Sequence, residues 1–415
     1  MRTHRRSNPG RSPRLVGAVV LVVALAFAGA CSKDPKFGGP GETPDPPKVT
    51  IVSPVDGATD VIAATELQFT LEGTQAAEVS LTDAAGNAVT GAMRADGSSW
   101  LPDEQLAYGT QYTATVTATK TDGSSAQATT TFTTMGEPGR TARVQSFNGD
   151  NVSYGVGMPI IINFDIDVPE SQRAVLERRL FVTTTPPQEG SWHWMSSYYH
   201  DAGSQVRYRP KEYWQTGTHV QARIALGGMP WGYEGVYGRN DLTLDFTIGD
   251  SHIIEVDNTT KRMTITVNGQ VLDRDIKVSL GRPALPSSSG HMLVMRREHP
   301  RVFDTTDRAS GGYRTEVQYA EQITTSGEFI HDAPWSVNQQ GNTNVSHGCL
   351  NVSPENGEWL YGFLVVGDPV IVTNTGKALA WGDGFTDWDK PWEEYRKGSA
   401  LYSATAAIPT PTASG

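Results

Sequence analysis

Apolar and polar positions alternate in short stretches along most of the chain, which is the pattern of half-buried β-strands. Between residues 49 and 134 such stretches, for example residues 67–71 and 112–116, are separated by turn residues about every 8–12 positions. Gly and Pro are plentiful, at 43 and 25 residues, which favours short strands joined by turns. This part of the chain is predicted to form a small β-sandwich.

The next part of the chain repeats features of the first. Residues 106–112 resemble the turn before a late strand of immunoglobulin-like modules, and residues 216–220 repeat that segment. We therefore expect two immunoglobulin-like modules in tandem, the first at residues 49–137 and the second at residues 138–250.

Residues 251–375 are also predicted to be mostly strand. Residues 253–257 and 263–267 alternate on either side of a turn, which predicts a hairpin, and Asn268-Gly269 predicts another tight turn.

One helix is expected in this third part. Ser353 suits the N-cap, Pro354 suits the first helical position and Glu355 suits the first turn. The apolar residues that follow recur on one face of the predicted helix; they are Trp359, Leu360, Phe363 and Leu364.

The segment from residue 376 to 402 is rich in aromatic residues. Trp381, Trp388 and Trp392 stand there among charged residues. Large rings at this density need a surface to cover, so the segment is predicted to pack as a clasp against the preceding domains. Residues 403–415 are predicted to be disordered.

Residues 1–30 have the pattern of a signal peptide. A basic stretch precedes an apolar run of 16 residues, which is short for a membrane span. The run ends in Ala-Gly-Ala before Cys31, which resembles a bacterial lipobox and predicts lipidation of Cys31; the alternative is an ordinary signal peptide in which Cys31 is incidental. Residues 31–48 are predicted to be a flexible tether. The expected location is thus outside the cell, at the membrane through a lipid anchor.

The cysteine count favours a reactive thiol. The chain has two cysteines, Cys31 and Cys349. If Cys31 is lipidated, Cys349 has no partner for a disulfide. A lone thiol in an oxidising compartment is a liability unless it has a chemical role, which favours Cys349 as a nucleophile.

Charge and motifs exclude other classes. A net charge of −11 argues against a nucleic-acid partner. The nine histidines form no His-Glu-x-x-His pattern and there are no cysteine pairs, so no metal is expected. No Gly-rich loop of the phosphate-binding kind is found either, and we expect no cofactor.

The segment with the richest chemistry contains His331-Asp332 and, after a gap of fourteen residues from His331, Ser346-His347-Gly348-Cys349-Leu350-Asn351. A cysteine attacks as the thiolate, and free Cys has a pKa of about 8.5. A histidine in contact takes the thiol proton and later returns it to a leaving amine. Gly348 permits a tight turn that aims backbone N–H groups at a developing oxyanion.

This pattern resembles the signature of the YkuD-type L,D-transpeptidases, and tandem immunoglobulin-like modules before the catalytic domain are similar to its multi-domain members. The implied fold is mainly β: two immunoglobulin-like sandwiches, then a β-rich YkuD-like catalytic domain (251–375) with a short helix. The implied reaction joins the third residues of two peptidoglycan stem peptides through a cysteine acyl-enzyme, with release of D-Ala from a tetrapeptide. Carbapenem-type β-lactams are expected to acylate the same cysteine.

The resemblance also implies roles for single residues. Cys349 is the expected nucleophile and His331 the expected base and acid. Asp332 is expected to hold the imidazole through its backbone carbonyl, and its carboxylate, where relatives have Ser, is expected to raise the pKa of His331. The backbone N–H groups of Gly348 and Cys349 are the expected oxyanion hole.

Substrate contacts are expected from the positions that match the family: Tyr313, Ser326, Gly327, Asp332, Trp335 and Asn351. Three of them keep a structural alternative. Tyr313 is a lid tyrosine or a core residue, Trp335 lines the cleft or packs beneath it, and Asn351 contacts substrate or supports the loop. His347 is expected to be structural, because adjacent residues in an extended turn point apart. The lid, from about residue 299 to 312, has Phe303 where a second tyrosine is familiar.

Other functions stay open. The same acyl-enzyme taken by water makes an L,D-carboxypeptidase, and taken by a protein amine it makes a protein-to-wall ligase. A protein of another class, a non-catalytic peptidoglycan-binding lipoprotein, is disfavoured because the nucleophile and base are both present with their spacing.

Overall fold

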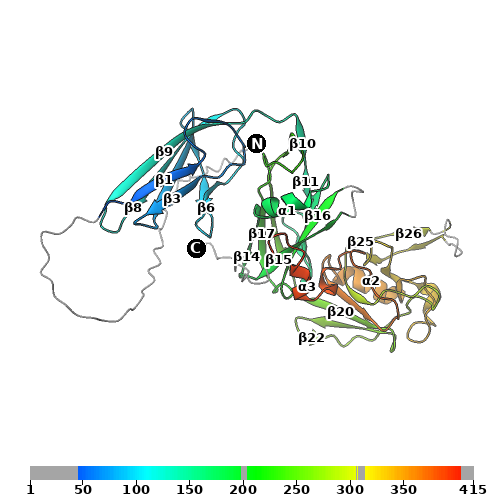
Figure 1. The fold of residues 1–415 in the computed structure, drawn as a ribbon. Coiled ribbons are helices and arrows are strands. Elements are labelled where there is room, and N and C mark those ends of the chain that lie inside the picture. The colour runs from blue at the N-terminus through cyan, green and yellow to red at the C-terminus, as the bar shows by residue number, and fades with distance from the viewer. Residues whose placement is uncertain (1–44, 198–202, 305, 307–313, 403–415) are drawn as a thin grey trace, which may run out of the picture. The chain divides into compact units, whose positions relative to one another are not determined.

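The computed structural model describes residues 45–197, 203–304, 306 and 314–402. Within these residues the fold is mainly β, as the sequence predicts, with strands grouped in three successive parts (Figure 1). The described helices include none that is long and apolar enough to cross a membrane. The domain boundaries expected above stay a prediction.

The first part is a sandwich of short strands. One layer is the five-stranded sheet β2-β9-β8-β4-β5, and the pairs β1-β3 and β6-β7, joined by a bridge between Leu67 and Trp100, lie outside it. Tyr112 accepts a hydrogen bond at its hydroxyl from the backbone N–H of Ala107, the tyrosine-corner contact of immunoglobulin-like folds. The strands are β1 (Lys48–Ser53), β2 (Ala58–Val61), β3 (Gln68–Glu72), β4 (Ala77–Asp83), β5 (Ala88–Val89), β6 (Gly91–Met93), β7 (Trp100–Pro102), β8 (Gln111–Thr119) and β9 (Ser125–Thr134).

The second part has two four-stranded sheets, β11-β13-β16-β15 and β12-β19-β17-β14, and a parallel pair, β10-β18. Its elements are β10 (Arg140–Ala142), β11 (Val144–Ser146), β12 (Ser153–Tyr154), β13 (Ile160–Phe164), α1 (Glu170–Glu177), β14 (Leu180–Thr185), β15 (Gly190–Ser196), β16 (Ser204–Pro210), β17 (His219–Ile224), β18 (Val236–Gly238) and β19 (Leu242–Ile248). Helix α1 is absent from the expectations above.

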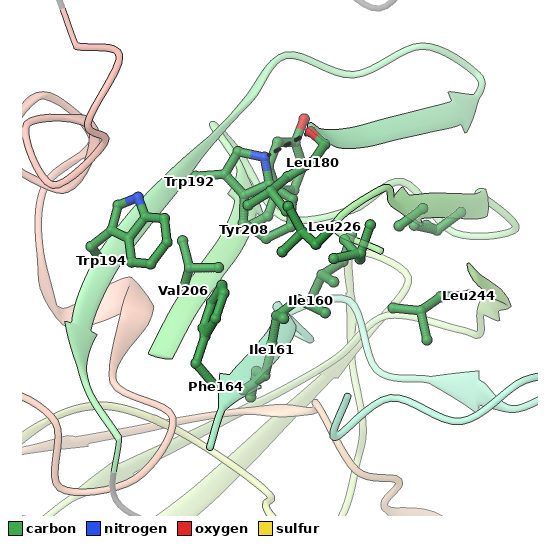
Figure 2. Packing of buried hydrophobic residues seen from close by; sticks show 14 of the residues in the cluster. Ile160, Ile161, Phe164, Leu180, Trp192, Trp194, Val206, Tyr208, Leu226 and Leu244 are labelled. Atoms are coloured by element: carbon green, nitrogen blue, oxygen red, sulfur yellow. Dashed lines mark hydrogen bonds between the residues drawn. The ribbon is translucent and has the colours of Figure 1, made fainter. Parts of the chain in front are cut away.

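Large side chains fill the core of the second part. Phe164 from β13 meets Trp194 from β15, with ring centroids 5.3 Å apart, and Val206 from β16 lies beside them (Figure 2). Leu180 and Leu244 contribute to the same core from strands of the other sheet. Alternating apolar positions of both sheets therefore face one another, which is how a β-sandwich buries its surface.

The third part carries the candidate site and is built on two sheets. A six-stranded sheet runs β22-β21-β20-β31-β24 with β23 beside β21, and a four-stranded sheet runs β25-β28-β29-β30; β26 and β27 pair separately. The strands are β20 (His252–Asp257), β21 (Arg262–Val267), β22 (Gln270–Val271), β23 (Ile276–Lys277), β24 (Gly290–Leu293), β25 (Arg296–Glu298), β26 (Arg301–Asp304), β27 (Arg314–Val317), β28 (Ala320–Gln322), β29 (Phe329–Asp332), β30 (Leu350–Val352) and β31 (Pro369–Thr373).

Local predictions in this part are confirmed. Strands β20 and β21 pair as a hairpin, and the tight turn at Asn268 and Gly269, both with positive φ, leads into β22. Helix α2 (Pro354–Phe363) has Ser353 as its N-cap, whose hydroxyl accepts the N–H of Asn356. A short 3₁₀ helix, η1 (Pro334–Ser336), follows β29.

The aromatic C-terminal segment packs on the second part. It holds η2 (Asp387–Asp389) and α3 (Trp392–Arg396). The guanidinium carbon of Arg209 from β16 lies 4.3 Å from the ring centroid of Trp388 and 4.4 Å from that of Tyr395, and Arg207 forms a 3.0 Å ion pair with the buried Asp387. Delocalised cations stacked on aromatic faces are favourable contacts, so the two arginines hold the segment in place.

Candidate active site

The four-stranded sheet of the third part brings the two expected reactive residues to neighbouring strands. Strands β29 and β30 pair in parallel, with His331 opposite Asn351. Cys349 immediately precedes β30, two residues before Asn351, and therefore faces the same side of the sheet as His331. Fourteen residues separate His331 from Ser346. They form most of the connection that brings the chain back so that β30 pairs beside β29.

His331 is held by its neighbour along the strand. Its Nδ1 atom lies 2.7 Å from the carbonyl oxygen of Asp332. A carbonyl oxygen only accepts, so Nδ1 carries the proton and the lone pair of the neutral ring is on Nε2. Burial lowers the pKa of His331, and it outweighs the opposing effects of the Asp332 carbonyl and the Asp332 charge. The contribution of the Asp332 charge to the pKa of His331 therefore has the expected direction, and burial is the larger effect.

The carboxylate of Asp332 has a role that the sequence did not suggest. Its Oδ1 accepts the backbone N–H groups of Gln318 and Tyr319, at 2.9 and 3.0 Å. These residues lie directly after β27, the second strand of the β26–β27 pair. Asp332 therefore connects the base to the segment that leaves the expected lid.

Cys349 lies in an apolar setting with only 7% of its surface exposed. It packs in a small cluster with Phe303, Val317, Ala320 and Phe329. The thiol donates toward the carbonyl of Gly327, with Sγ 3.8 Å from the oxygen. Phe303, which stands where a tyrosine is familiar, contacts His331 with ring centroids 5.2 Å apart. The lid strand β26 thus supplies an apolar cover for both reactive residues.

The turn before Cys349 depends on a glycine and a serine. Gly348 has a φ of +131°, a backbone conformation that side chains disfavour. Its N–H donates to the hydroxyl oxygen of Ser346 at 3.1 Å, and that hydroxyl donates to the carbonyl of Cys349 at 2.6 Å. The Gly348 N–H therefore already donates a hydrogen bond inside the turn. It can contribute to the predicted oxyanion hole only if this hydrogen bond breaks.

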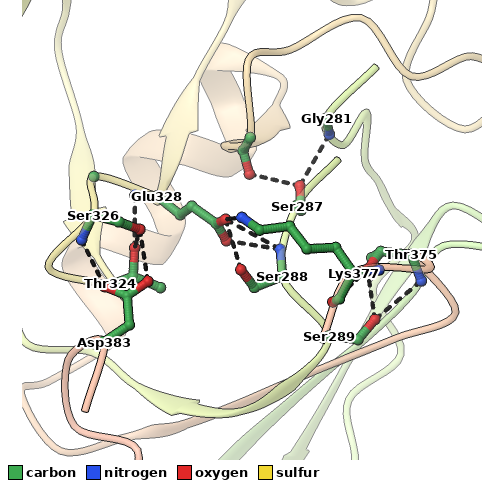
Figure 3. Close-up of polar contacts among 12 residues, drawn as sticks. Gly281, Ser287, Ser288, Ser289, Thr324, Ser326, Glu328, Thr375, Lys377 and Asp383 are labelled. Atoms are coloured by element: carbon green, nitrogen blue, oxygen red, sulfur yellow. Dashed lines mark hydrogen bonds and ion pairs between the residues drawn. The ribbon is translucent and has the colours of Figure 1, made fainter. Parts of the chain in front are cut away.

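The turn between β28 and β29 lies beside the thiol and includes two expected substrate contacts, Ser326 and Gly327. The Ser326 hydroxyl donates to Asp383 at 2.7 Å, so its proton is engaged with the C-terminal segment (Figure 3). At Gly327 a Cβ atom would meet no atom within 4 Å, so this position borders open space. Glu328 turns the other way and receives the N–H and hydroxyl of Ser288.

The remaining expected residues have different settings. Trp335 is 53% exposed, with its ring centroid 6.0 Å from that of His331, so it borders the site and is not packed beneath it. Asn351 is buried, its amide donates to the Ser336 hydroxyl at 3.1 Å, and its Oδ1 has no hydrogen-bond partner within the described part of the chain. His347 is half-buried. Tyr313 and Cys31 lie outside the described residues.

Sequence reasoning missed two acids at the site, Asp383 and Glu328. Asp383 is 57 residues from Ser326 along the chain, so no local pattern connects them. Across the described ranges, no group of three or more His, Cys, Asp or Glu residues is arranged to hold a metal ion.

Comparisons with known proteins agree in pointing to one family. A family model of the L,D-transpeptidase catalytic domain (YkuD) matches residues 251–372, and one of the bacterial Ig domain matches residues 58–230. L,D-transpeptidase 2 of Mycobacterium tuberculosis (strain CDC 1551 / Oshkosh) is 36% identical over 360 residues, which are 85% of this chain and 85% of that protein. L,D-transpeptidase 5 of Mycobacterium tuberculosis (strain ATCC 25618 / H37Rv) is 34% identical over 360 residues, covering 86% and 78%.

Among solved structures, an LD transpeptidase, LdtMt1, in complex with imipenem is 31% identical, covers 56% of this chain and 99% of its own, and has a TM-score of 0.46. The sequence relatives carry the assignment, because a 36% identical protein aligns over most of both chains. This chain belongs to the L,D-transpeptidase family and is an acyltransferase of that type.

Proposed function

We propose that the chain cross-links peptidoglycan by joining the third residues of two stem peptides, with Cys349 as the nucleophile. The Cys349 sulfur bonds to the carbonyl carbon of the diamino acid in a tetrapeptide stem, and the bond from that carbon to the D-Ala nitrogen breaks. His331 takes the thiol proton and gives it to the departing D-Ala amine. The side-chain amine of a second stem then attacks the thioester and frees the thiol.

The observation that carries this proposal is the hydrogen bond from His331 Nδ1 to the Asp332 carbonyl, at 2.7 Å. It fixes the tautomer in which Nε2 is the basic nitrogen, on the strand beside the nucleophile. Burial lowers the pKa of His331 and keeps the ring neutral, which is the form that accepts a proton. The Phe303 cover reduces access of water to the thioester, which favours transfer to an amine.

Carbapenem-type β-lactams are the proposed inhibitors. Attack of the Cys349 sulfur on the lactam carbonyl opens the four-membered ring, so the drug remains bound as a thioester and no fragment leaves. The protein then gains the mass of one intact drug molecule, which makes a carbapenem a direct probe of the nucleophile.

The test uses residues 46–415, which form one compact unit. This protein is incubated with a carbapenem and its intact mass is recorded beside that of Cys349→Ala. We expect one drug per parent molecule and none on Cys349→Ala. Incubation with a tetrapeptide stem then identifies the acceptor by product mass: a cross-linked dimer supports transpeptidation, and a tripeptide indicates hydrolysis. A folded parent that gains no drug and consumes no tetrapeptide would contradict the proposal.

We also propose that the mature chain is exported and anchored by a lipid on Cys31, facing the cell wall. The Ala-Gly-Ala-Cys31 sequence after an apolar run supports this. Replacement of Cys31 by Ser is expected to move the protein from the detergent phase to the aqueous phase of cell extracts; an unchanged partition would exclude the anchor.

A further inference from the structure

The turn formed by residues 324–328 is the part of the fold that presents a carbonyl to the nucleophile. It joins β28 to β29, and the Gly327 oxygen lies 3.8 Å from Cys349 Sγ. The base His331 follows on β29, four residues after Gly327. The position of this turn therefore affects both the orientation of the thiol and the shape of the open space beside it.

The ends of the turn are bonded to each other, because the N–H of Glu328 donates to the Thr324 hydroxyl at 2.9 Å and the N–H of Ile323 donates to the Glu328 carbonyl at 3.0 Å. The apex at Gly327 is less well fixed. Gly327 has a φ of +102°, and its N–H reaches the Thr324 carbonyl at a long 3.4 Å. A Cβ atom at Gly327 would meet nothing within 4 Å, so no packed side chain supports the turn there. A glycine at the apex keeps conformational freedom, which contacts from outside the turn can restrict.

The outside contacts come from Asp383 in the C-terminal segment (Figure 3). Its Oδ1 accepts the Thr325 hydroxyl and the Ser326 N–H, both at 2.7 Å, and its Oδ2 accepts the Ser326 hydroxyl at 2.7 Å. Short hydrogen bonds to an ionised carboxylate are stronger than those between neutral groups. One side chain thus holds the two residues that precede Gly327.

Asp383 is itself held by the second sandwich. The next residue, Gly384, lies close to Met295, which precedes β25, and to the β28–β29 connection: a Cβ atom there would be 2.8 Å from Met295 Sδ and 3.2 Å from the Ile323 oxygen. Arg207 of β16 donates to the Gly384 carbonyl at 3.0 Å and pairs with Asp387 at the same distance. The backbone beside Asp383 is thus held both by the β28–β29 connection and, through Arg207, by a strand of the second sandwich.

The geometry points to Asp383 as a positioning residue: through Thr325 and Ser326 it holds the 324–328 turn against Cys349, so that the C-terminal segment sets the geometry of the nucleophile. This inference rests on the proposed acyl transfer by Cys349. Asp383 touches no reacting atom, and its effect is on how well the thiol is placed. Misplacement of a reacting group by about 1 Å is enough to cost about 100-fold in rate.

The test compares two reactions of the same sulfur in the compact unit, residues 46–415. Acylation by a carbapenem needs the thiol placed against a bound carbonyl, whereas alkylation by iodoacetamide needs a reactive and accessible thiolate. We expect Asp383→Ala to acylate about 10- to 100-fold more slowly than the parent, with alkylation unchanged. Asp383→Asn keeps an oxygen for Thr325 and the Ser326 N–H, so it is expected to recover most of the acylation rate.

The matched control is Asp389→Ala. Asp389 is an acid of the same segment that accepts the N–H of His291, on β24, at 3.0 Å. We expect it to acylate and alkylate at parent rates. Melting temperatures of all variants separate misplacement from loss of fold.

Each result decides the inference. Acylation by Asp383→Ala at the parent rate would overturn it, and so would an equal loss of alkylation, since Asp383 would then act on thiol reactivity or on the fold. If Asp383→Ala does not fold, Thr325→Val, which removes one of the hydrogen bonds to Asp383, takes its place, and a parent ratio of its acylation and alkylation rates would overturn the inference. Failure of the proposed function shows separately, because the parent itself would not be acylated.

Discussion

The sheet β25-β28-β29-β30 buries His331 on one face and Glu321 on the other, and the two ionisable side chains have different settings. His331 on β29 is 3% exposed, and burial lowers its pKa. Glu321 on β28 is fully buried, and burial raises its pKa to about 8. The pairing of His331 with Ala320, and of Ile330 with Glu321, places the two groups on opposite faces. Both groups are therefore uncharged at neutral pH.

The neighbours of the two groups differ. His331 has its Nδ1 fixed by the Asp332 carbonyl and shares its face with Cys349 and an exposed Trp335. Glu321 shares its face with Ile330, and neither of its carboxylate oxygens has a hydrogen-bond partner among the residues that the structure describes. A perturbed pKa alone therefore does not mark a catalytic group in this fold. His331 differs from Glu321 in its fixed tautomer and in the neighbouring Cys349.

The largest expected effect comes from the catalytic face. Replacing His331 by Gln removes the base while keeping a side chain of similar size. We expect the rate of carbapenem acylation to fall by about 10²–10⁴-fold, the usual contribution of general acid–base catalysis. The measurement is the rate of mass gain at pH 7.

Glu321→Gln is the control from the opposite face, and it is expected to acylate at the parent rate. A loss with Glu321→Gln as large as that with His331→Gln would show that the two faces are not functionally distinct.

The next effect belongs to Glu321 itself and appears as pH-dependent stability. Its pKa is about 8 in the folded chain, against an ordinary value of 4.5 for a glutamate side chain. Between these values the folded state keeps a proton that the unfolded state releases, so stability falls as pH rises through this window. In Glu321→Gln this loss is absent. We expect the variant to gain about 3 kcal/mol relative to the parent when the pH is raised from 5 to 8.

Urea unfolding of both proteins at the two pH values measures this difference. All other titrating groups are shared, so the change in the difference between parent and variant isolates Glu321. A difference that stays constant from pH 5 to 8 would mean that Glu321 is ionised in the folded chain, paired with Arg297, which lies opposite it on β25.

Features encoded within a few residues were predictable from the sequence. The cap at Ser353 marked helix α2, and Asn268-Gly269 marked the turn into β22. The signature spacing singled out Cys349 and His331 as candidates, and the parallel pairing of β29 with β30 places His331 opposite Asn351, two residues after Cys349.

Features that depend on distant contacts were not predictable. Helix α1 follows Pro169 without a side-chain cap, so Glu170 in its first turn is a weak signal of its start. Asp383 binds Ser326, which is 57 residues away along the chain. Which face of the strand that contains Glu321 is buried depends on core residues contributed by other strands. The Gly348 N–H was expected to face substrate, but the side chain of Ser346, two residues away, takes it first.

The smallest expected effect is that of the Asp332 charge. The Asp332 carbonyl accepts a hydrogen bond from His331, and its carboxylate accepts the N–H groups of Gln318 and Tyr319. Asp332→Asn keeps the carbonyl and an oxygen for the two N–H groups but removes the charge that raises the pKa of His331. The pKa of His331 should then fall further below its usual 6.5. Since His331 must be neutral to accept the thiol proton, the acid limb of the acylation rate should move to lower pH, with little change in the plateau. Rates of mass gain between pH 4 and 8 measure this shift. An acid limb that stays in place would show that the Asp332 carboxylate only holds Gln318 and Tyr319. The pKa of His331 would then depend on burial and on the Asp332 carbonyl, and not on the Asp332 charge.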